Sequence, residues 1–222
     1  MKSAKTIVMS ATPNWPGSRP NSSPVSIISS QLSSASPLLR DWFGALPRDE
    51  KIRVLRAWIR ATPRLNDEQI APRDVDWRTW VLLGGRGSGK TFAGGFWLNE
   101  LAREKDWTFA LVGPALHDVR EVMVEGPSGL KAQAARDNRP RWEAGRRRLI
   151  WPSGSAAYAF SAEDPDSLRG PQFHAAWADE FCAWRHAEAT LSNLRFGLRL
   201  GEDPRLAITT TPRPIAALRW LL

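Results

Sequence analysis

The chain has 222 residues, of which 42% are hydrophobic, so it can form one large domain or one domain with an appendage, and a wholly disordered protein is excluded. Its 31 basic and 23 acidic residues give a formal charge of +8, which favours a polyanionic partner such as nucleic acid. The single cysteine, Cys182, excludes an internal disulfide and a cysteine-based zinc site, and we expect a buried thiol in a reducing compartment. No apolar run approaches the roughly 20 residues that a membrane-spanning helix needs.

Residues 1–36 are rich in serine and proline and contain no acidic residue. Such a segment buries too little apolar surface to offset the entropy lost on ordering. We therefore expect a disordered N-terminal extension, or a segment read from an upstream start codon. An organellar transit peptide has a similar composition and is the alternative interpretation.

Residues 37–76 are expected to form a helical lead-in to the main domain. Ile52, Leu55 and Ile59 recur at helical spacing, and Pro47 stands where the first turn of a helix tolerates proline. The pattern predicts a helix over residues 47–61, followed by the loop LNDEQIAPRDVDW.

From residue 77 onwards, apolar strand patterns alternate with helical patterns. We expect strands at 80–83, 107–113, 173–180 and 205–212, and a hairpin around the turn Pro152-Ser153-Gly154. Helices are expected at 92–102, 117–126 and 213–222. This alternation predicts an α/β fold over residues 77–222, with a mostly parallel sheet between helices.

The clearest motif is GGRGSGKT, which follows the first of these strands and opens a helix. Its glycines let backbone N–H groups turn towards phosphates, and the helix N-terminus adds a positive dipole. Lys90 is expected to reach the β- and γ-phosphates of ATP, and the Thr91 hydroxyl to bind Mg²⁺. The alternative is a glycine-rich turn with an incidental lysine. The predicted ATP-binding residues of this loop are Gly84, Gly85, Arg86, Gly87, Ser88, Gly89, Lys90 and Thr91.

A pair of carboxylates ends the apolar strand at 173–180. Asp179 stands where a phosphate-loop enzyme needs a carboxylate to hold Mg²⁺, and Glu180 could orient and polarise an attacking water. An acidic helix cap after a strand is the alternative. A glutamate base favours phosphoryl transfer to water over transfer to a bound acceptor.

Three further groups of residues have two interpretations each. Thr209, Thr210 and Thr211 end a strand, where hydroxyls could sense the γ-phosphate, although threonine is also common in strands. Arg169, on an expected loop, could contact a γ-phosphate in its own or a neighbouring subunit, or be a solvated surface residue. The run Arg146–Arg148 enters an expected strand, where side chains alternate, and a solvated edge is favoured over a DNA contact. The three histidines lack metal-ligand spacing.

Together these motifs resemble the ATPase domain of the terminase large subunit, the motor that packages DNA into phage capsids and gene transfer agent particles. The similarity extends over about residues 64–222 and follows the order and spacing of the family. The matching stretches are DWRTWVLLGGRGSGKTFAGGFWL, GPALHDVREVMVEGPSGL, SAEDPDSLRGPQFHAAWADEFCAW and ITTTPRP.

The resemblance implies a P-loop NTPase of the RecA-like class that uses ATP and Mg²⁺ to translocate double-stranded DNA. By resemblance, Gln69 senses adenine, Arg169 completes the active site of a neighbouring subunit, and Thr209–Thr211 couple hydrolysis to DNA movement. The implied partners are double-stranded DNA, a portal protein and a small terminase subunit. A homo-oligomeric ring on the portal and a location in the bacterial host cytoplasm are also implied.

The resemblance has one departure. The family's large subunit continues into a nuclease domain with a ribonuclease H-like fold, whereas this sequence stops at Leu222, just after the coupling motif. We therefore expect a fragment, a truncated gene or an ATPase-only protein, without nuclease activity. The alternatives are a helicase-like ATPase, which would need a second motor lobe, and a catalytically silent remnant that binds nucleotide without turnover.

Overall fold

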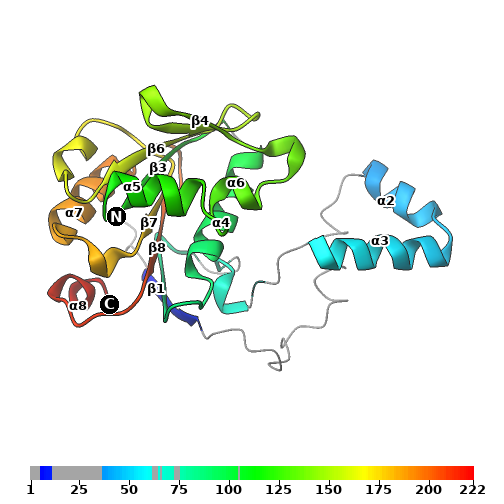
Figure 1. Ribbon diagram of the computed structural model, residues 1–222, viewed down its shortest axis with the longest axis horizontal. Coiled ribbons are helices and arrows are strands. Elements are labelled where there is room, and N and C mark those ends of the chain that lie inside the picture. The colour runs from blue at the N-terminus through cyan, green and yellow to red at the C-terminus, as the bar shows by residue number, and fades with distance from the viewer. Residues whose placement is uncertain (1–5, 12–36, 62–64, 66, 73–75, 105) are drawn as a thin grey trace. The chain divides into compact units, whose positions relative to one another are not determined.

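The computed structural model describes residues 6–11, 37–61, 65, 67–72, 76–104 and 106–222 (Figure 1). The chain divides into two compact units. One spans Trp15–Asp67 and contains the helices α2 (Pro37–Ala45) and α3 (Arg48–Ala61). Helix α3 confirms the prediction of a helix over residues 47–61. The other unit combines Met1–Asn14 with Glu68–Leu222, so Gln69 belongs to it and not to the helical lead-in with which the sequence analysis grouped it.

The larger unit is built on one eight-stranded sheet with the order β1-β2-β8-β7-β3-β6-β5-β4. The pairings from β1 through to β6 are parallel, and the pairings β6–β5 and β5–β4 are antiparallel. The α/β class and the mostly parallel sheet are therefore confirmed, as is the hairpin around residues 152–154. The strands are β1 (Thr6–Ala11), β2 (Thr79–Gly84), β3 (Thr108–Gly113), β4 (Arg141–Glu143), β5 (Arg148–Ile150), β6 (Ala156–Ser161), β7 (Ala175–Asp179) and β8 (Arg205–Thr210).

Helices cover both faces of this sheet, with α4 and α6 on one side and α7 and α8 on the other (Figure 1). The α-helices of this unit are α4 (Lys90–Glu104), α5 (Leu116–Asp118), α6 (Leu130–Gln133), α7 (Ala187–Gly197) and α8 (Ala216–Leu221). The π-helix η2 (Val119–Val124) continues α5. The 3-10 turns are η1 (Asp67–Gln69), η3 (Arg136–Asn138), η4 (Ala144–Arg146), η5 (Pro165–Leu168) and η6 (Phe181–Ala183). Of the helices described, none is both long and apolar enough to cross a bilayer.

Alternating strand residues form two cores, one on each face of the sheet. Val81, Val112 and Ile208 are fully buried in the core that includes Leu191 of α7 and Leu218 of α8. The intervening residues, such as Trp80, Leu111 and Trp177, are also fully buried. Strands buried on both faces have continuous apolar sequences, which is why β2, β3 and β7 were detectable from sequence.

Two local expectations need correction. Thr6–Ala11 form β1, which pairs in parallel register with β2, although disorder was expected over residues 1–36; the rest of that segment lies outside the described residues. The segment TIVMSA contains β-branched and apolar residues, which favour a strand, and it pairs with the edge of β2. Ile7 and Met9 are half-buried, and Val8 is exposed. In the run Arg146–Arg148 only Arg148 enters a strand, because Arg146 ends η4 and Arg147 has a left-handed φ of 49°.

Removing β1 is expected to destabilise the sheet next to the candidate phosphate loop. A chain starting at residue 12 would lose the half-burial of Ile7 and Met9, worth about 2 kcal/mol. For a chain of this size we expect Tm to fall by roughly 4–8 °C in a thermal melt. A chain starting at residue 6, which keeps the strand, is the control. Equal Tm values for the two shortened chains would contradict a stabilising role for β1.

Candidate active site

The candidate site lies where three adjacent parallel strands end. Strand β8 pairs with β2 on one side and with β7 on the other, so the carboxyl ends of all three meet at one edge of the sheet. Asp179 and Thr209 are partners in the register of β7 and β8. The loop of residues 85–89 leaves β2 at this edge and leads into α4. Ligands of open α/β sheets bind at such edges.

The loop between β2 and α4 has the backbone that a phosphate cradle requires. Gly87 and Gly89 have φ values of 77° and 78°, in the left-handed region that side chains disfavour. A Cβ at Gly89 would also lie 2.6 Å from Nε2 of Gln69. Glycine is therefore needed at residue 89 for two reasons, its conformation and its close contact with a neighbouring side chain.

Lys90 is the first residue of α4 and lies across this loop. Its side chain is 5% exposed, and its ammonium donates a hydrogen bond to the Gly85 carbonyl oxygen at 3.0 Å. The ammonium also lies 3.7 Å from Oε1 of Glu180. The loop lysine and the second strand-end carboxylate therefore meet in the folded chain although they are far apart in the sequence.

Asp179 is buried and accepts hydrogen bonds from two hydroxyls. Thr209 Oγ1 donates to Oδ1 at 2.6 Å, and Thr91 Oγ1 donates to Oδ2 at 3.3 Å. Burial raises the pKa of Asp179 from 3.8 to about 6, with the hydrogen bond from Thr209 acting against the rise and the charge of Glu180 adding to it. The carboxylate is therefore in a place where negative charge is costly unless a cation is bound nearby.

Glu180 has a strained backbone and a held side chain. Its φ and ψ are 49° and 45°, a left-handed conformation that costs a side-chain-bearing residue about 1–2 kcal/mol. The backbone N–H and the hydroxyl of Thr211 donate to its two carboxylate oxygens at 3.2 and 3.3 Å. The side chain is 38% exposed, so water can reach the carboxylate.

Two hydrogen bonds hold the turn that carries Glu180, one from Trp184 and one to Thr210. The indole N–H of Trp184 donates to the Asp179 carbonyl at 2.9 Å, and Thr210 Oγ1 accepts the Cys182 N–H at 2.9 Å. Each of the threonines 209–211 thus bonds to a different part of the strand-end turn of β7. Cys182 itself is a buried free thiol, as expected.

The donors at this edge fit a magnesium ion. Thr91 and Asp179 offer two oxygens within hydrogen-bonding distance of each other, and the buried Asp179 carboxylate keeps its charge most easily beside a cation. Mg²⁺ is commonly held by one or two protein oxygens together with substrate phosphates and water. Within the described part of the chain there is no cluster of three or more histidine, cysteine, aspartate or glutamate side chains suited to a metal.

Two predicted site residues are placed differently from the rest. Gln69 is buried, and its Nε2 donates to the Ser88 carbonyl at 2.6 Å, so it packs against the phosphate loop itself. Arg169 is 71% exposed and lies 3.1 Å from Asp166 in an ion pair. Among the described residues it makes no ion pair with Glu180 or Asp179. Adenine contact by Gln69 and a catalytic role for Arg169 stay predictions.

Sequence reasoning missed the aromatic residues that support the site. Trp177 and Trp184 flank the carboxylate pair in sequence, and the indole of each donates a hydrogen bond at the strand end. The sequence analysis singled out none of the tryptophans. The closeness of these two to Asp179 in the sequence was the available signal.

A family comparison identifies the sequence. The family described as terminase large subunit, T4-like virus type, N-terminal region, matches residues 81–218, which is more than half of the chain. No curated protein sequence matches the chain.

Solved structures resemble the chain at low sequence identity. The large terminase of a thermophilic bacteriophage, in complex with ATP-γ-S, is 17% identical, with a TM-score of 0.50, over 63% of this chain and 33% of that chain. The same phage protein in complex with ADP is 17% identical, with a TM-score of 0.49, over 60% of this chain and 33% of that chain. The ATPase domain of the Thermus phage P74-26 large terminase is 20% identical, with a TM-score of 0.49, over 72% of this chain and 68% of that chain.

The chain thus spans about a third of the length of the large terminase that was solved with ATP-γ-S and with ADP. Its sheet, its phosphate loop and the carboxylates of β7 are those of a P-loop NTPase. The chain belongs to the family of terminase large subunits of the T4-like virus type, whose N-terminal region it matches.

Proposed function

We propose that the chain hydrolyses ATP with Mg²⁺ and that hydrolysis drives double-stranded DNA into a phage-like capsid. The observation that carries the enzymatic part is the convergence of Lys90, Thr91, Asp179 and Glu180 at one edge of the sheet. Nucleotide binding is supported by the family and by the fold shared with the thermophilic phage's large terminase, whose structure contains ATP-γ-S.

Binding of ATP would use the loop of Gly84–Thr91. Its N–H groups and the N-terminus of α4 present positive partial charges to the phosphates, and the Lys90 ammonium would exchange the Gly85 carbonyl for phosphate oxygens. Thr91 and Asp179 would hold Mg²⁺, which supplies charge neutralisation between the β- and γ-phosphates when bound. Gln69 would contact adenine, as the resemblance implies, and would steady the loop through its hydrogen bond to the Ser88 carbonyl.

Glu180 would act as the general base. Its carboxylate is partly exposed and held by Thr211, so it is positioned to accept a proton from a water that attacks the γ-phosphorus. Thr209 and Thr211 contact the metal-side carboxylate and the base respectively, which supports their proposed role in coupling hydrolysis to movement. A motor of this kind would work in the cytoplasm of the bacterial host, with a portal protein and a small terminase subunit as partners.

Replacing the base tests the enzymatic proposal and separates it from a silent remnant. Glu180→Gln keeps the size of the side chain but cannot take up the proton. We expect kcat for ATP hydrolysis to fall at least about 10²-fold, with nucleotide affinity nearly unchanged. Glu188→Gln, on the exposed side of α7, is the control. Turnover of the Glu180 variant within a few-fold of the parent would remove Glu180 from this role, and a parent without turnover would favour the remnant.

Arg169 is proposed to act on the nucleotide of a neighbouring subunit. It is exposed on the segment that follows η5, its ion-pair partner Asp166 is equally exposed, and it is followed by Gly170 with a φ of 109°. An arginine inserted beside the γ-phosphoryl group can raise kcat about 10³- to 10⁵-fold. A homo-oligomeric ring would bring this exposed side chain to the next active site.

Mixing two inactive variants tests where Arg169 acts. Arg169→Ala keeps Glu180, and Glu180→Gln keeps Arg169. If Arg169 reaches across an interface, mixed oligomers on DNA contain some sites with both residues, and we expect ATPase activity to return. If Arg169 acts within its own subunit, no site in any mixture has both residues. No recovery in oligomers shown to be mixed would therefore falsify a shared site.

Half of the net charge lies in one segment at the far edge of the sheet from β1. Residues 136–148 contain six arginines and two carboxylates, a net charge of +4 of the chain's +8. Arg148 and Arg141 both contact Glu143 at 2.8 Å, and the hydrogen bond from Arg148 is the main cause that lowers the pKa of Glu143. We call the exposed arginines of this segment the arginine ribbon: Arg136, Arg139, Arg141, Arg146 and Arg147.

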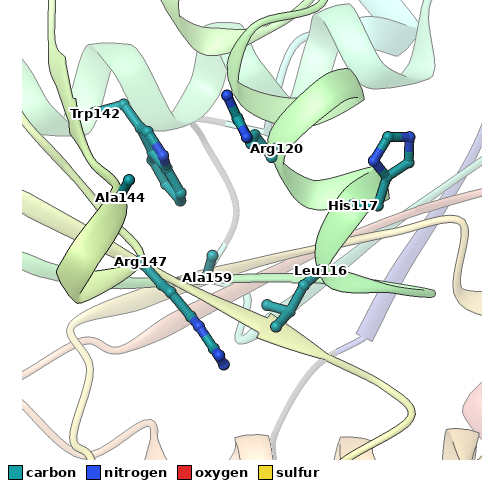
Figure 2. Close-up of a pocket in the computed structure, with 7 residues that line it drawn as sticks. All are labelled: Leu116, His117, Arg120, Trp142, Ala144, Arg147 and Ala159. Atoms are coloured by element: carbon teal, nitrogen blue, oxygen red, sulfur yellow. The ribbon is translucent and has the colours of Figure 1, made fainter.

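The run Arg146–Arg148 alone was expected to be a solvated edge, but it forms part of a larger cluster, and we propose that the arginine ribbon contacts the phosphates of DNA. Arg147 keeps a left-handed conformation, with its N–H bonded to Ala144 and its carbonyl accepting the Ala159 N–H at 2.9 Å. A pocket of about 260 Å³ separates Trp142 and Arg147 from Leu116 and Arg120 (Figure 2). A surface that carries five exposed arginines attracts polyanions.

The salt dependence of DNA binding tests this surface. Each lost phosphate contact should lower the slope of log K against log salt by about 0.9. We expect the triple variant Arg139→Gln, Arg146→Gln, Arg147→Gln to lose about 2.7 units of slope on duplexes of random sequence, about 0.9 for each arginine. The control removes three other exposed arginines, by Arg185→Gln, Arg199→Gln and Arg219→Gln. Equal slopes for the two triple variants would exclude the ribbon as the DNA contact.

A further inference from the structure

A chain of two hydrogen bonds links the core of the sheet to the predicted metal site. The indole N–H of Trp177 donates to Thr209 Oγ1 at 2.8 Å, and Thr209 Oγ1 donates to Asp179 Oδ1 at 2.6 Å. Trp177 and Thr209 are fully buried, and Asp179 is 3% exposed. Trp177 and Asp179 lie on β7 and Thr209 on β8, so the two strands are joined through side chains as well as through their backbone ladder.

The indole determines what the threonine hydroxyl does. A hydroxyl has one proton to donate and two lone pairs that accept. Because one lone pair of Thr209 is taken by the indole N–H, the proton must point away from Trp177. Two acceptors are then in reach, Asp179 Oδ1 at 2.6 Å and the Ala178 carbonyl at 3.3 Å, and the carboxylate is the closer and the stronger.

The consequence is a fixed orientation of the carboxylate. With Oδ1 held by Thr209, the other oxygen, Oδ2, is the one directed to Thr91 at 3.3 Å. We propose that Trp177 is a positioning residue that acts through Thr209 to present Oδ2 of Asp179 to Mg²⁺. This deepens the proposed function, because it rests on Mg²⁺ being held by Thr91 and Asp179.

The same helix that supplies Thr91 also seats the indole. A Cβ at Gly94 of α4 would lie 2.3 Å from Nε1 and 2.4 Å from Cε2 of Trp177. Any larger residue at 94 would therefore displace the ring from Thr209. Gly94 follows Lys90 and Thr91 by four and three residues, so the three share one face of the helix. The position of α4 thus determines where Thr91 lies and where the indole of Trp177, which bonds to Thr209, is held.

The test measures Mg²⁺ through nucleotide binding. Trp177→Phe keeps an aromatic ring and removes the N–H donor. Using the full chain and a fluorescent ATP analogue, we expect the half-saturating Mg²⁺ concentration to rise about 10- to 100-fold, the usual loss when a group that orients a metal ligand is removed. Affinity for the analogue in EDTA should stay unchanged, because Lys90 and the loop are intact. The control is Trp151→Phe, a buried indole that donates to Asn99 Oδ1 at 3.0 Å, away from the site.

Three further variants keep the proposal testable if Trp177→Phe does not fold. Thr209→Val removes the hydroxyl and should reproduce the shift, Thr209→Ser restores it and should return the parent's Mg²⁺ dependence, and Gly94→Ala should shift it by displacing the indole. The double variant Trp177→Phe, Thr209→Val should be no worse than either single variant, because both break one chain of bonds.

The outcomes separate this proposal from the proposed function. Three results would each overturn the positioning role. The first is parental Mg²⁺ dependence in Trp177→Phe or Thr209→Val, and the second is additive shifts in the double variant. The third is a parent that binds the analogue equally with and without Mg²⁺. A parent that shows the expected Mg²⁺ dependence but no hydrolysis would leave the positioning role standing and remove the ATPase.

Discussion

The burial of the Asp179 carboxylate is the constraint on which the rest of the site depends. A carboxylate taken out of water at a sheet edge needs hydrogen-bond donors and, to keep its charge, a cation. The hydroxyls of Thr91 and Thr209 supply the donors from α4 and β8. The contact with Thr209 requires β8 to lie next to β7, as it does in the observed strand order. The strand order thus brings the hydroxyl of Thr209 to the Asp179 carboxylate.

The different roles proposed for the two carboxylates agree with their difference in exposure. Asp179 is buried, so it favours a bound cation and is held rigidly. Glu180 is partly exposed, so water reaches it, and its contacts with Thr211 at 3.2 Å and Lys90 at 3.7 Å are longer than the 2.6 Å hydrogen bond between Asp179 and Thr209. Adjacent residues in a strand point to opposite sides, but the left-handed backbone of Glu180 turns both carboxylates towards α4 and β8. The left-handed conformation of Glu180 therefore places the carboxylates of two adjacent residues at the same edge of the sheet.

The sequence predicted those parts of the fold in which local pattern and tertiary environment agree. The buried strands β2, β3, β7 and β8 are continuous apolar runs, and the phosphate loop has fixed glycine positions. Strand β1 was missed because a composition argument over 36 residues hides a six-residue strand that is stabilised only by its pairing with β2. Helix α7 was missed because Leu191 and Leu194 are the large apolar residues of its buried face, and the other buried residues, Ala187, Thr190 and Gly197, are small. The roles of Trp177 and Gly94 depend on a contact between distant segments, which no local pattern contains.

Strand β8 pairs with β2 as far as Thr210 and with β7 as far as Thr209. A strand that is paired on both sides cannot tilt or slide without breaking hydrogen bonds to both neighbouring strands, so β8 is held in place. Thr211 is the first residue beyond the ladders, and it is also the residue that grips the Glu180 carboxylate. Residues 212–215 connect Thr211 to α8 and its buried Leu218, so a displacement of Thr211 would reach α8 along the chain through these four residues. The coupling proposed for Thr211 would therefore pass through this short connector, while the paired strands of the sheet stay in place.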